Sequence, residues 1–397
     1  MKIGILREEK VPVDKRTPFS PSQCKRIISD FSNIEIYVQS SKFRCYSDRE
    51  YLLNNISVLE DISFCDILFG IKEVPIDRLI ANKTYFFFSH TIKKQDYNRD
   101  LLKKMVSLNI KMIDYEVLNF DNGSRILGFG RYAGIIGAYN GLLTYGLKTN
   151  SFNLKPAHLC FDRKEMDNQL KKVVLNNEKL LVTGKGRVGK GILETLKKLN
   201  INEVDKDDYL TKTFDYPVFL NIDVMDYNER IDKMKSNFLD FINNYKDYKS
   251  SFMKFVSKTN IYFAGHFYAN GAPYLFTRKD VRSKHFNISV VADVSCDIDG
   301  PVATTIRASK ITDPIYGYNK LTEDEDDFMK DDVIAVMAVD NLPCELPKDA
   351  SKDFGENLIQ YVIPILHSNN SILERATICN EGDLTKHFEY LSDFINS

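Results

Sequence analysis

Lys179-Leu-Leu-Val-Thr-Gly184-Lys-Gly186-Arg-Val-Gly189-Lys-Gly191-Ile192, near the middle of the chain, is the stretch that decides the fold. An apolar run with strand character precedes its glycines, and apolar residues at helical spacing follow them. A strand, a G-x-G-x-x-G turn and a helix are the order that a dinucleotide site requires, because the glycines permit a tight turn and close approach of a pyrophosphate. We therefore predict cofactor contacts from Gly184, Gly186, Arg187, Val188 and Gly189, with a purely structural turn as the alternative.

The length of the chain predicts two domains. Its 397 residues exceed what one hydrophobic core usually supports, and about 180 of them precede the glycine turn. Short apolar runs alternate with helical patterns on both sides of the turn, which predicts βαβ units. We predict an α/β fold of two Rossmann-like domains with mainly parallel sheets, separated by an active-site cleft. The predicted domains are residues 1–140 plus 345–397 for substrate and catalysis, and residues 141–344 for the dinucleotide.

The expected elements follow from the same patterns. Strands are expected in the first domain at residues 3–6, 34–38, 67–71, 84–88 and 110–113, and in the second at 180–182, 218–222, 260–264, 288–294 and 333–339. Helices are expected at residues 21–31 and 95–108, and a long connecting helix is expected to include residues 139–147 after a segment rich in small residues.

Composition excludes several classes of protein. Lysine plus arginine (54) nearly balance aspartate plus glutamate (55), so we expect no nucleic-acid partner. The seven cysteines show no CxxC pair, which favours neither a disulfide framework nor a metal site and fits a reducing cytoplasm. No apolar run approaches ~18 residues and no leader pattern is visible, so we expect neither membrane insertion nor export. The sequence does not predict an oligomeric state.

An acidic residue normally closes the second strand of a nucleotide-binding unit, about 20 residues beyond the glycines, where it accepts the ribose hydroxyls. Asp205 stands closest to that place in the sequence, and its carboxylate would repel a 2′-phosphate. This favours NAD, with NADP possible because Arg187 and Lys206 are near. A surface-exposed aspartate is the alternative.

Two polar residues follow strands of the first domain. Lys72 comes after an apolar run ending at Ile71, and His90 comes after a run ending at Ser89. Parallel sheets place ligands at the carboxyl ends of their strands, and both side chains can exchange protons near neutral pH when their surroundings adjust the pKa. The alternatives are a solvated lysine and a hydrogen-bonded core histidine.

A group of cations near strand ends and turns would suit an acidic substrate, because guanidinium groups bind carboxylates in bidentate fashion. Glu116 is the one anion among them, and it could hold an ammonium group. Individually, each of these residues could also be a surface charge. The cations are Arg7, Arg16, Lys93, Arg125 and Arg131.

Motifs spread from the first residues to about residue 365 make the chain similar to a known family. They are Leu6-Arg-Glu-Glu9 with Thr17-Pro18, Gly70-Ile-Lys-Glu73, Ser89-His-Thr-Ile-Lys-Lys-Gln95, Asp114-Tyr-Glu116, Phe129-Gly-Arg-Tyr-Ala-Gly134, Val291-Ala-Asp-Val-Ser-Cys-Asp-Ile-Asp-Gly300, Asp313-Pro-Ile-Tyr-Gly-Tyr318 and Asp340-Asn-Leu-Pro-Cys-Glu-Leu-Pro347. In this order they resemble the lysine-forming saccharopine dehydrogenases and lysine-ketoglutarate reductase domains, which share an architecture with alanine dehydrogenase and transhydrogenase domains. Residues 205–260 align poorly with this family.

The resemblance implies roles for individual residues. It implies that Lys72 and His90 are the acid–base pair, and that Asp297 lies in the nicotinamide-facing segment. It implies substrate binding by Arg7, Lys93, Gln95, Glu116 and Arg125. The implied reaction is the NAD(P)-dependent conversion of saccharopine to lysine and 2-oxoglutarate, a small-molecule amino-acid reaction.

Two other functions stay open at this point. An alanine-dehydrogenase-like enzyme would aminate a small 2-oxo acid, but it would have no use for Glu116 and so many cations. A catalytically silent NAD-binding protein would make the pairing of Lys72 with His90 accidental.

Overall fold

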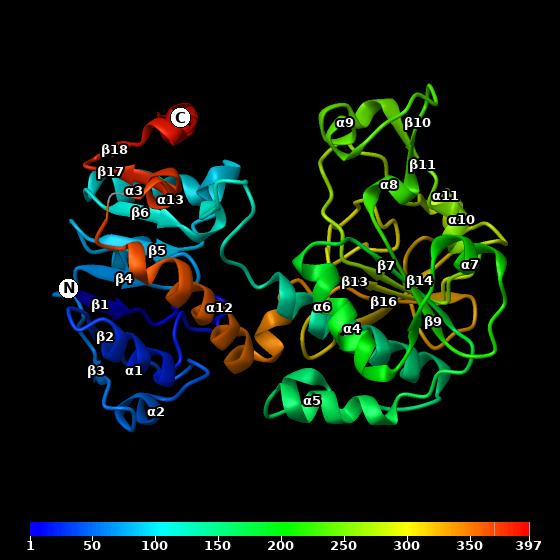
Figure 1. Cartoon of the computed structure of the whole chain (residues 1–397), viewed down its shortest axis with the longest axis horizontal. Coiled ribbons are helices and arrows are strands. Elements are labelled where there is room, and N and C mark those ends of the chain that lie inside the picture. Colours follow the sequence, from blue (N-terminus) through cyan, green and yellow to red (C-terminus); the bar gives the residue numbers. More distant parts are fainter. Residues whose placement is uncertain (369, 397) are drawn as a thin grey trace. The chain divides into compact units, whose positions relative to one another are not determined.

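The computed structural model describes residues 1–368 and 370–396 and divides the chain into two compact units. The first unit comprises Met1–Phe129 and Pro347–Ser397, and the second comprises Gly130–Leu346 (Figure 1). The sequence analysis set the first boundary at residue 140, whereas the structure keeps all of helix α4 (Gly130–Thr149) in the second unit. The segment predicted at 345–397 includes residues 369 and 397, which lie outside the described residues.

The sheet of the first unit has a run of parallel strands in the order β3-β2-β1-β4-β5-β6. Strand β17 (Thr377–Asn380) pairs antiparallel with β6, and β18 (Asp383–Leu384) pairs antiparallel with β17. The order reverses between β1 and β4, which makes that crevice the switch point of the sheet. The parallel strands are β1 (Lys2–Ile5), β2 (Glu35–Gln39), β3 (Ser57–Leu59), β4 (Ile67–Phe69), β5 (Thr84–Phe87) and β6 (Lys111–Asp114).

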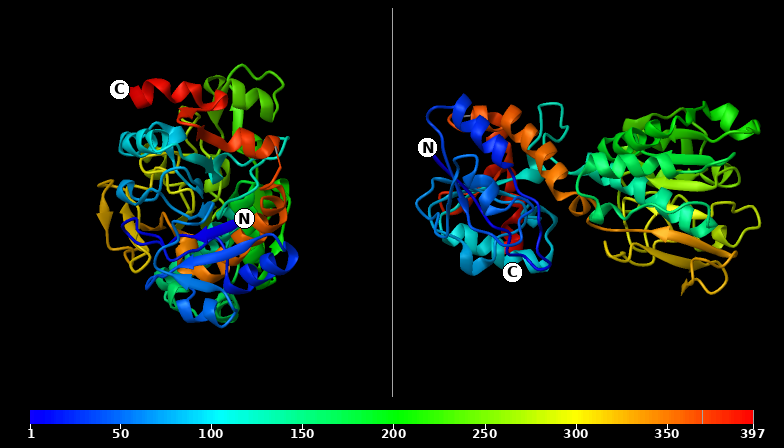
Figure 2. Two further views of the ribbon diagram at one scale, coloured as in Figure 1. Left: turned by 90° about the vertical axis from the view of Figure 1, so that its left-hand side faces the viewer. Right: turned by 90° about the horizontal axis from the view of Figure 1, so that it is seen from below.

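Helices from both ends of the chain complete the first unit. Helix α1 (Pro21–Asp30) begins with a capping box between Ser20 and Gln23, and it buries Cys24 and Ile27. Gln23 also donates to the Lys352 carbonyl of α12 (Pro347–Tyr361), so the C-terminal segment returns to this unit (Figure 2). The remaining helices are α2 (Asp48–Leu52), α3 (Arg99–Ser107), α13 (Ser371–Ala376) and α14 (Ser392–Asn396).

The sheet of the second unit repeats this plan. Its parallel strands follow the order β8-β9-β7-β12-β13-β16, so the switch point lies between β7 and β12, and β14 and β15 form an antiparallel edge. Strands β10 and β11 pair as a separate two-stranded sheet. The strands are β7 (Lys179–Thr183), β8 (Asn202–Glu203), β9 (Val218–Ile222), β10 (Asn228–Arg230), β11 (Tyr248–Ser250), β12 (Ile261–Ala264), β13 (Val290–Asp293), β14 (Ile315–Asn319), β15 (Glu325–Asp326) and β16 (Val333–Met337). The helices besides α4 are α5 (Arg163–Gln169), α6 (Arg187–Leu196), α7 (Lys206–Thr211), α8 (Val224–Tyr227), α9 (Phe238–Asn243), α10 (Met253–Val256) and α11 (Arg278–Val281).

Helices α4 and α6 pack backbone against backbone. A Cβ atom on Gly134 would lie 2.0 Å from the Val188 carbonyl oxygen, and one on Gly191 would lie 2.1 Å from the Arg131 carbonyl oxygen. The Arg131 guanidinium also binds both carboxylate oxygens of Glu194 at 2.9 Å. These contacts fix the first turn of α6, which follows the glycine turn.

The prediction of two α/β units with mainly parallel sheets is confirmed. Each predicted strand is found with its ends shifted by at most a few residues, and the predicted long helix is α4. The cleft between the domains stays a prediction. Across residues 1–368 and 370–396, no helix has both the length and the apolar character needed to cross a membrane.

Candidate active site

The carboxyl ends of parallel strands bring the predicted catalytic residues of the first unit to one edge of its sheet. Glu8 follows β1, Lys72 follows β4, His90 follows β5 and Glu116 follows β6. Strands β4 and β5 pair directly, with Phe69 opposite Phe86, so the segments that carry Lys72 and His90 leave the sheet side by side. This is the edge at which parallel α/β sheets bind ligands.

His90 is held by the residue next to Lys72. Its Nδ1 lies 2.7 Å from Oε1 of Glu73, and the other oxygen of that carboxylate accepts from Nζ of Lys10 at 2.7 Å. Burial raises the pKa of Glu73, but the bonds from His90 and Lys10 prevail and lower it to about 2. His90 also has a left-handed backbone, with φ of 53°. A non-glycine residue in that region is strained, and such strain clusters at functional sites.

Lys72 is half-buried, and its surroundings disfavour the charged ammonium. Burial lowers the pKa of Lys72, and the positive charge of Arg16 lowers it further. Arg16 is itself buried, binds Asp14 through Nε at 3.0 Å and lies 4.1 Å from the centre of the Phe129 ring. A lysine in such surroundings can exchange protons nearer to neutral pH than a solvated one.

Three residues predicted to bind substrate meet at Glu116. Its Oε1 lies 3.1 Å from Nζ of Lys93 and accepts from a terminal guanidinium nitrogen of Arg125 at 3.3 Å. Its Oε2 is buried and, among the described residues, has no hydrogen-bond partner. A buried acceptor without a partner is costly, so this oxygen is suited to a ligand that donates.

Asp114 joins the ends of β5 and β6 beside these groups. Its carboxylate accepts from the hydroxyl and the amide of Ser89, and from the amide of Glu116 at 2.7 Å. Burial raises the pKa of Asp114 to about 6 despite these bonds. No role was predicted for Asp114 from the sequence, although its carboxylate holds Ser89, which precedes His90, and the backbone of Glu116.

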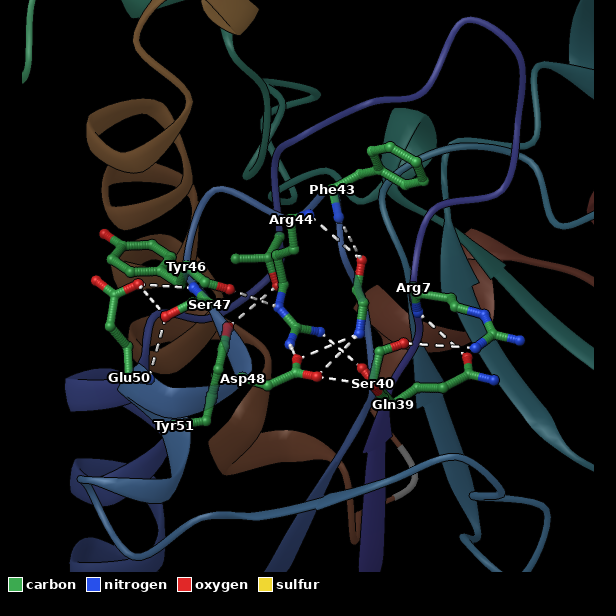
Figure 3. A network of polar contacts seen from close by, with 12 residues as sticks. Arg7, Gln39, Ser40, Phe43, Arg44, Tyr46, Ser47, Asp48, Glu50 and Tyr51 are labelled. Carbon is green, nitrogen blue, oxygen red and sulfur yellow. Dashed lines mark hydrogen bonds and ion pairs between the residues drawn. The ribbon is translucent and has the colours of Figure 1, made fainter.

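Arg7 and Gln95 have other partners. The Arg7 guanidinium binds Glu9 at 3.1 Å and also pairs with Glu60, beside the network that links Gln39 and Ser40 to Arg44 and Asp48 (Figure 3). Gln95 is exposed and accepts from the Tyr97 hydroxyl at 2.7 Å. The structure therefore does not gather either residue with the Glu116 cluster. Arg16, whose charge acts on Lys72, is the arginine next to the predicted catalytic pair.

The glycine turn of the second unit fits a dinucleotide. Gly184 has φ of +95°, and a Cβ on Gly189 would lie 1.9 Å from the Gly184 carbonyl oxygen, so neither position tolerates a side chain. A Cβ on Gly186 would meet nothing within 4 Å, and Gly186 caps helix α6 without a side chain. Open space above the unsatisfied N–H groups of a helix N-terminus is what a pyrophosphate requires.

The remaining residues predicted to bind the cofactor surround this turn. Arg187 and Val188 form the first turn of α6, with Arg187 exposed and Val188 facing Gly265 and Gly134. Asp297 lies in the loop after β13, where burial raises its pKa. No group of three or more His, Cys, Asp or Glu side chains that could hold a metal occurs within the described part of the chain.

The structure places Asp205, the predicted ribose-reading carboxylate, away from the glycine turn. Asp205 follows β8, which lies at the edge of the sheet, and its side chain caps α7 through the Asp208 amide at 2.8 Å. The strand beside β7 is β9, and Asp223 follows it directly. Gly184 donates to the Ile222 carbonyl at 3.0 Å, so Asp223 is the acid at the glycine turn. The segment β8–α7 is inserted before β9, so counting 20 residues from the glycines reaches the edge strand instead.

His266, after β12, is a second residue that the sequence analysis missed. It is buried, its Nδ1 lies 2.9 Å from the Thr183 hydroxyl, and burial lowers its pKa to about 4. The turn after β12 reaches the glycine turn, because a Cβ on Gly184 would lie 2.5 Å from the Gly265 carbonyl oxygen. A histidine after an apolar strand was the only signal in the sequence, and it does not separate a core residue from a site residue.

These features define a chain of two α/β units, the second of which carries a glycine turn suited to a dinucleotide. The fold matches a solved L-alanine dehydrogenase with a TM-score of 0.67 at 15% identity, covering 100% of this chain and 99% of that one. A transhydrogenase from Sinorhizobium meliloti also matches, with a TM-score of 0.57 at 12% identity, covering 97% of this chain and 99% of that one.

The chain belongs to the alanine dehydrogenase/PNT family. The model of the family's N-terminal domain matches residues 4–136, and the model of its C-terminal domain matches residues 218–388. An alpha-aminoadipic semialdehyde synthase from Arabidopsis thaliana is 29% identical over 98% of this chain and 41% of its own length. A saccharopine dehydrogenase [NAD(+), L-lysine-forming] from Yarrowia lipolytica is 23% identical over 91% of each chain. The chain thus spans less than half the length of the Arabidopsis relative but nearly all of the Yarrowia one.

Proposed function

We propose that this chain interconverts saccharopine with L-lysine and 2-oxoglutarate and uses NAD in preference to NADP. The observation that carries the proposal is the His90–Glu73 pair beside the half-buried Lys72, on the same sheet edge as Glu116 with its two cations. Similarity to L-lysine-forming saccharopine dehydrogenases along most of the chain supports this substrate.

Lys72 and His90 serve the proton transfers of this reaction. Oxidation of the C–N bond of saccharopine removes a hydride and the N–H proton, water adds to the resulting imine, and the C–N bond then breaks. When bound, the oxidised nicotinamide ring of NAD would accept that hydride. Glu73 orients the His90 ring through Nδ1 and leaves Nε2 for the substrate, while desolvation prepares Lys72 to exchange a second proton.

The Glu116 cluster accounts for the charges of the substrate. Lys93 and Arg125 bind substrate carboxylates, and the unpartnered Oε2 of Glu116 accepts from an ammonium group. A small 2-oxo acid such as pyruvate offers one carboxylate and no ammonium, so it would leave most of this cluster unused. Asp223 at the glycine turn favours NAD because its negative charge would repel a 2′-phosphate.

The test is the loss of NADH absorbance with lysine plus 2-oxoglutarate, compared with ammonia plus pyruvate and repeated with NADPH. We expect turnover with lysine, 2-oxoglutarate and NADH. Faster turnover with ammonia and pyruvate would replace the proposal with an alanine-dehydrogenase-like activity. NADH binding by fluorescence without turnover of either pair would indicate a catalytically silent protein.

A further inference from the structure

The two units use the same sheet plan but fill their switch points differently. In the second unit, the turn after β7 is Gly184-Lys185-Gly186, and it leaves open space where an anion can reach backbone N–H groups. In the first unit, the equivalent strand is β1, which like β7 is the first strand of its sheet along the chain and lies at the reversal of strand order. The residues that follow it are Leu6, Arg7 and Glu8, with no glycine.

The Glu8 carboxylate spans the switch point of the first unit. Its Oε1 accepts from the Ile71 amide at 2.6 Å, and its Oε2 accepts from the Lys72 amide at 2.8 Å. Both amides belong to the segment after β4, on the far side of the crevice from β1.

We infer that Glu8 is an internal hydrogen-bond acceptor that takes the place of a bound anion in the first unit and positions Lys72 through its backbone. Each carboxylate oxygen satisfies one amide, so the peptide that carries Lys72 is fixed at two consecutive N–H groups. Burial raises the pKa of Glu8 to about 8, and the charge of Asp14 also raises it, whereas the bonds from the two amides and the charge of Arg16 lower it. Burial also raises the pKa of the nearby Tyr115 hydroxyl, and Glu8 contributes to that rise.

The inference rests on the proposed function only for its effect on turnover, and it has a consequence that needs no substrate. Without the carboxylate, the amides of Ile71 and Lys72 lose their acceptors. Their hydrogen exchange should accelerate by about tenfold or more in Glu8→Ala, and Glu8→Gln should release mainly one of the two because its amide group keeps one acceptor oxygen. Glu35→Gln, on an exposed carboxylate of the neighbouring strand β2, is the matched control and should change neither amide.

Two further measurements separate positioning from general stability. Formate should restore protection of the two amides in Glu8→Ala, whereas chloride at equal ionic strength should not, because a small carboxylate can occupy the vacated position. Trace acetylation of Lys72 as a function of pH should show that its pKa moves in Glu8→Ala and stays unchanged in Glu35→Gln, because that pKa depends on the half-buried position of Lys72 and Glu8 holds the Lys72 backbone there.

Turnover is the last readout. The kcat for the proposed reaction should fall in Glu8→Ala and Glu8→Gln, while the dissociation constant for NADH, which the second unit binds, should stay within twofold. Unchanged exchange at both amides in both variants, or an equal change in Glu35→Gln, would overturn the inference. If the exchange responds but lysine and 2-oxoglutarate give no turnover, the positioning role stands and the proposed function fails. If Glu8→Ala does not fold, Glu8→Gln decides the matter alone.

Discussion

Replacing Asp223 by asparagine should weaken the discrimination between NADH and NADPH, and replacing Asp205 should not. Asp223 directly follows the strand beside the glycine strand, and its Oδ1 caps α8 through the Val224 amide at 2.7 Å. Asparagine caps helices as well as aspartate does, so the variant keeps the helix and loses only the charge. Asp205→Asn is the matched control, because Asp205 is also a helix cap but follows the edge strand.

The expected magnitude follows from Coulomb's law. A 2′-phosphate carries about 1.5 to 2 negative charges. At a separation of about 5 Å and an effective dielectric constant of about 40 to 80 for this half-buried position, its repulsion by Asp223 is about 1 to 3 kcal/mol. Removing that repulsion should narrow the ratio of the NADPH and NADH dissociation constants by roughly 5- to 150-fold. Added salt should narrow the ratio in the unmodified protein as well.

Titration of cofactor fluorescence at low and at high salt measures these ratios directly. Asp223→Asn should also bind NADH more weakly, because the ribose hydroxyls lose a charged acceptor. The reasoning would be refuted by an Asp223→Asn ratio within twofold of the unmodified protein, or by an Asp205→Asn variant that changes the ratio as much.

Three further predictions test the rest of the site and the fold. Lys72→Met and His90→Gln should each lower kcat by ~10²-fold or more in steady-state assays, with little change in NADH affinity. Full activity in either variant would show that the replaced residue does not have the proposed role. Gly186→Ala should fold normally but bind NADH poorly, because the added Cβ points into the open space where the pyrophosphate would lie. Gly134→Ala should lower the free energy of unfolding, measured in urea, by more than ~2 kcal/mol, because the added Cβ would meet the Val188 carbonyl. Equal effects of the two variants on unfolding would contradict the packing argument. Burial raises the pKa of Glu345 to about 8. Between about pH 4.5 and pH 8 the folded state therefore keeps a proton on Glu345 that the unfolded state has lost, and the free energy of unfolding falls as the pH rises through this range. The free energy of unfolding of Glu345→Gln, measured in urea, should therefore rise relative to that of the unmodified protein between pH 5 and pH 8. A difference between the two proteins that does not change with pH would contradict the raised pKa of Glu345.

Periodicity and strand ends predicted more of the fold than of the site. The apolar runs marked the parallel strands because such strands are buried on both faces, and the two-residue strand β8 has no such run to detect. The antiparallel edge strand β17 lies in the C-terminal segment and pairs with β6, a contact between residues far apart in the sequence. Local patterns carry no information about such pairings.

The same limit explains the site. Lys72, His90 and Glu116 were singled out because each lies within three residues of a strand end, and the parallel sheet brings their segments to one edge. Asp205 was chosen because the spacing rule assumes that consecutive strands are neighbours, and the inserted β8–α7 segment breaks that assumption. Arg7 was predicted from its place after β1, but the direction of a long side chain depends on its partners, here Glu9 and Glu60.

The turn that carries His90 has a backbone conformation that is unfavourable for its residues. It ends in left-handed backbone at both His90 and Lys94, where glycine or asparagine would be more comfortable. Replacing either residue by glycine would relieve the local backbone strain, but at position 90 it would also remove the imidazole that pairs with Glu73 and that the proposed mechanism uses for proton transfer. Selection for robustness and selection for turnover would therefore drive this loop toward different sequences.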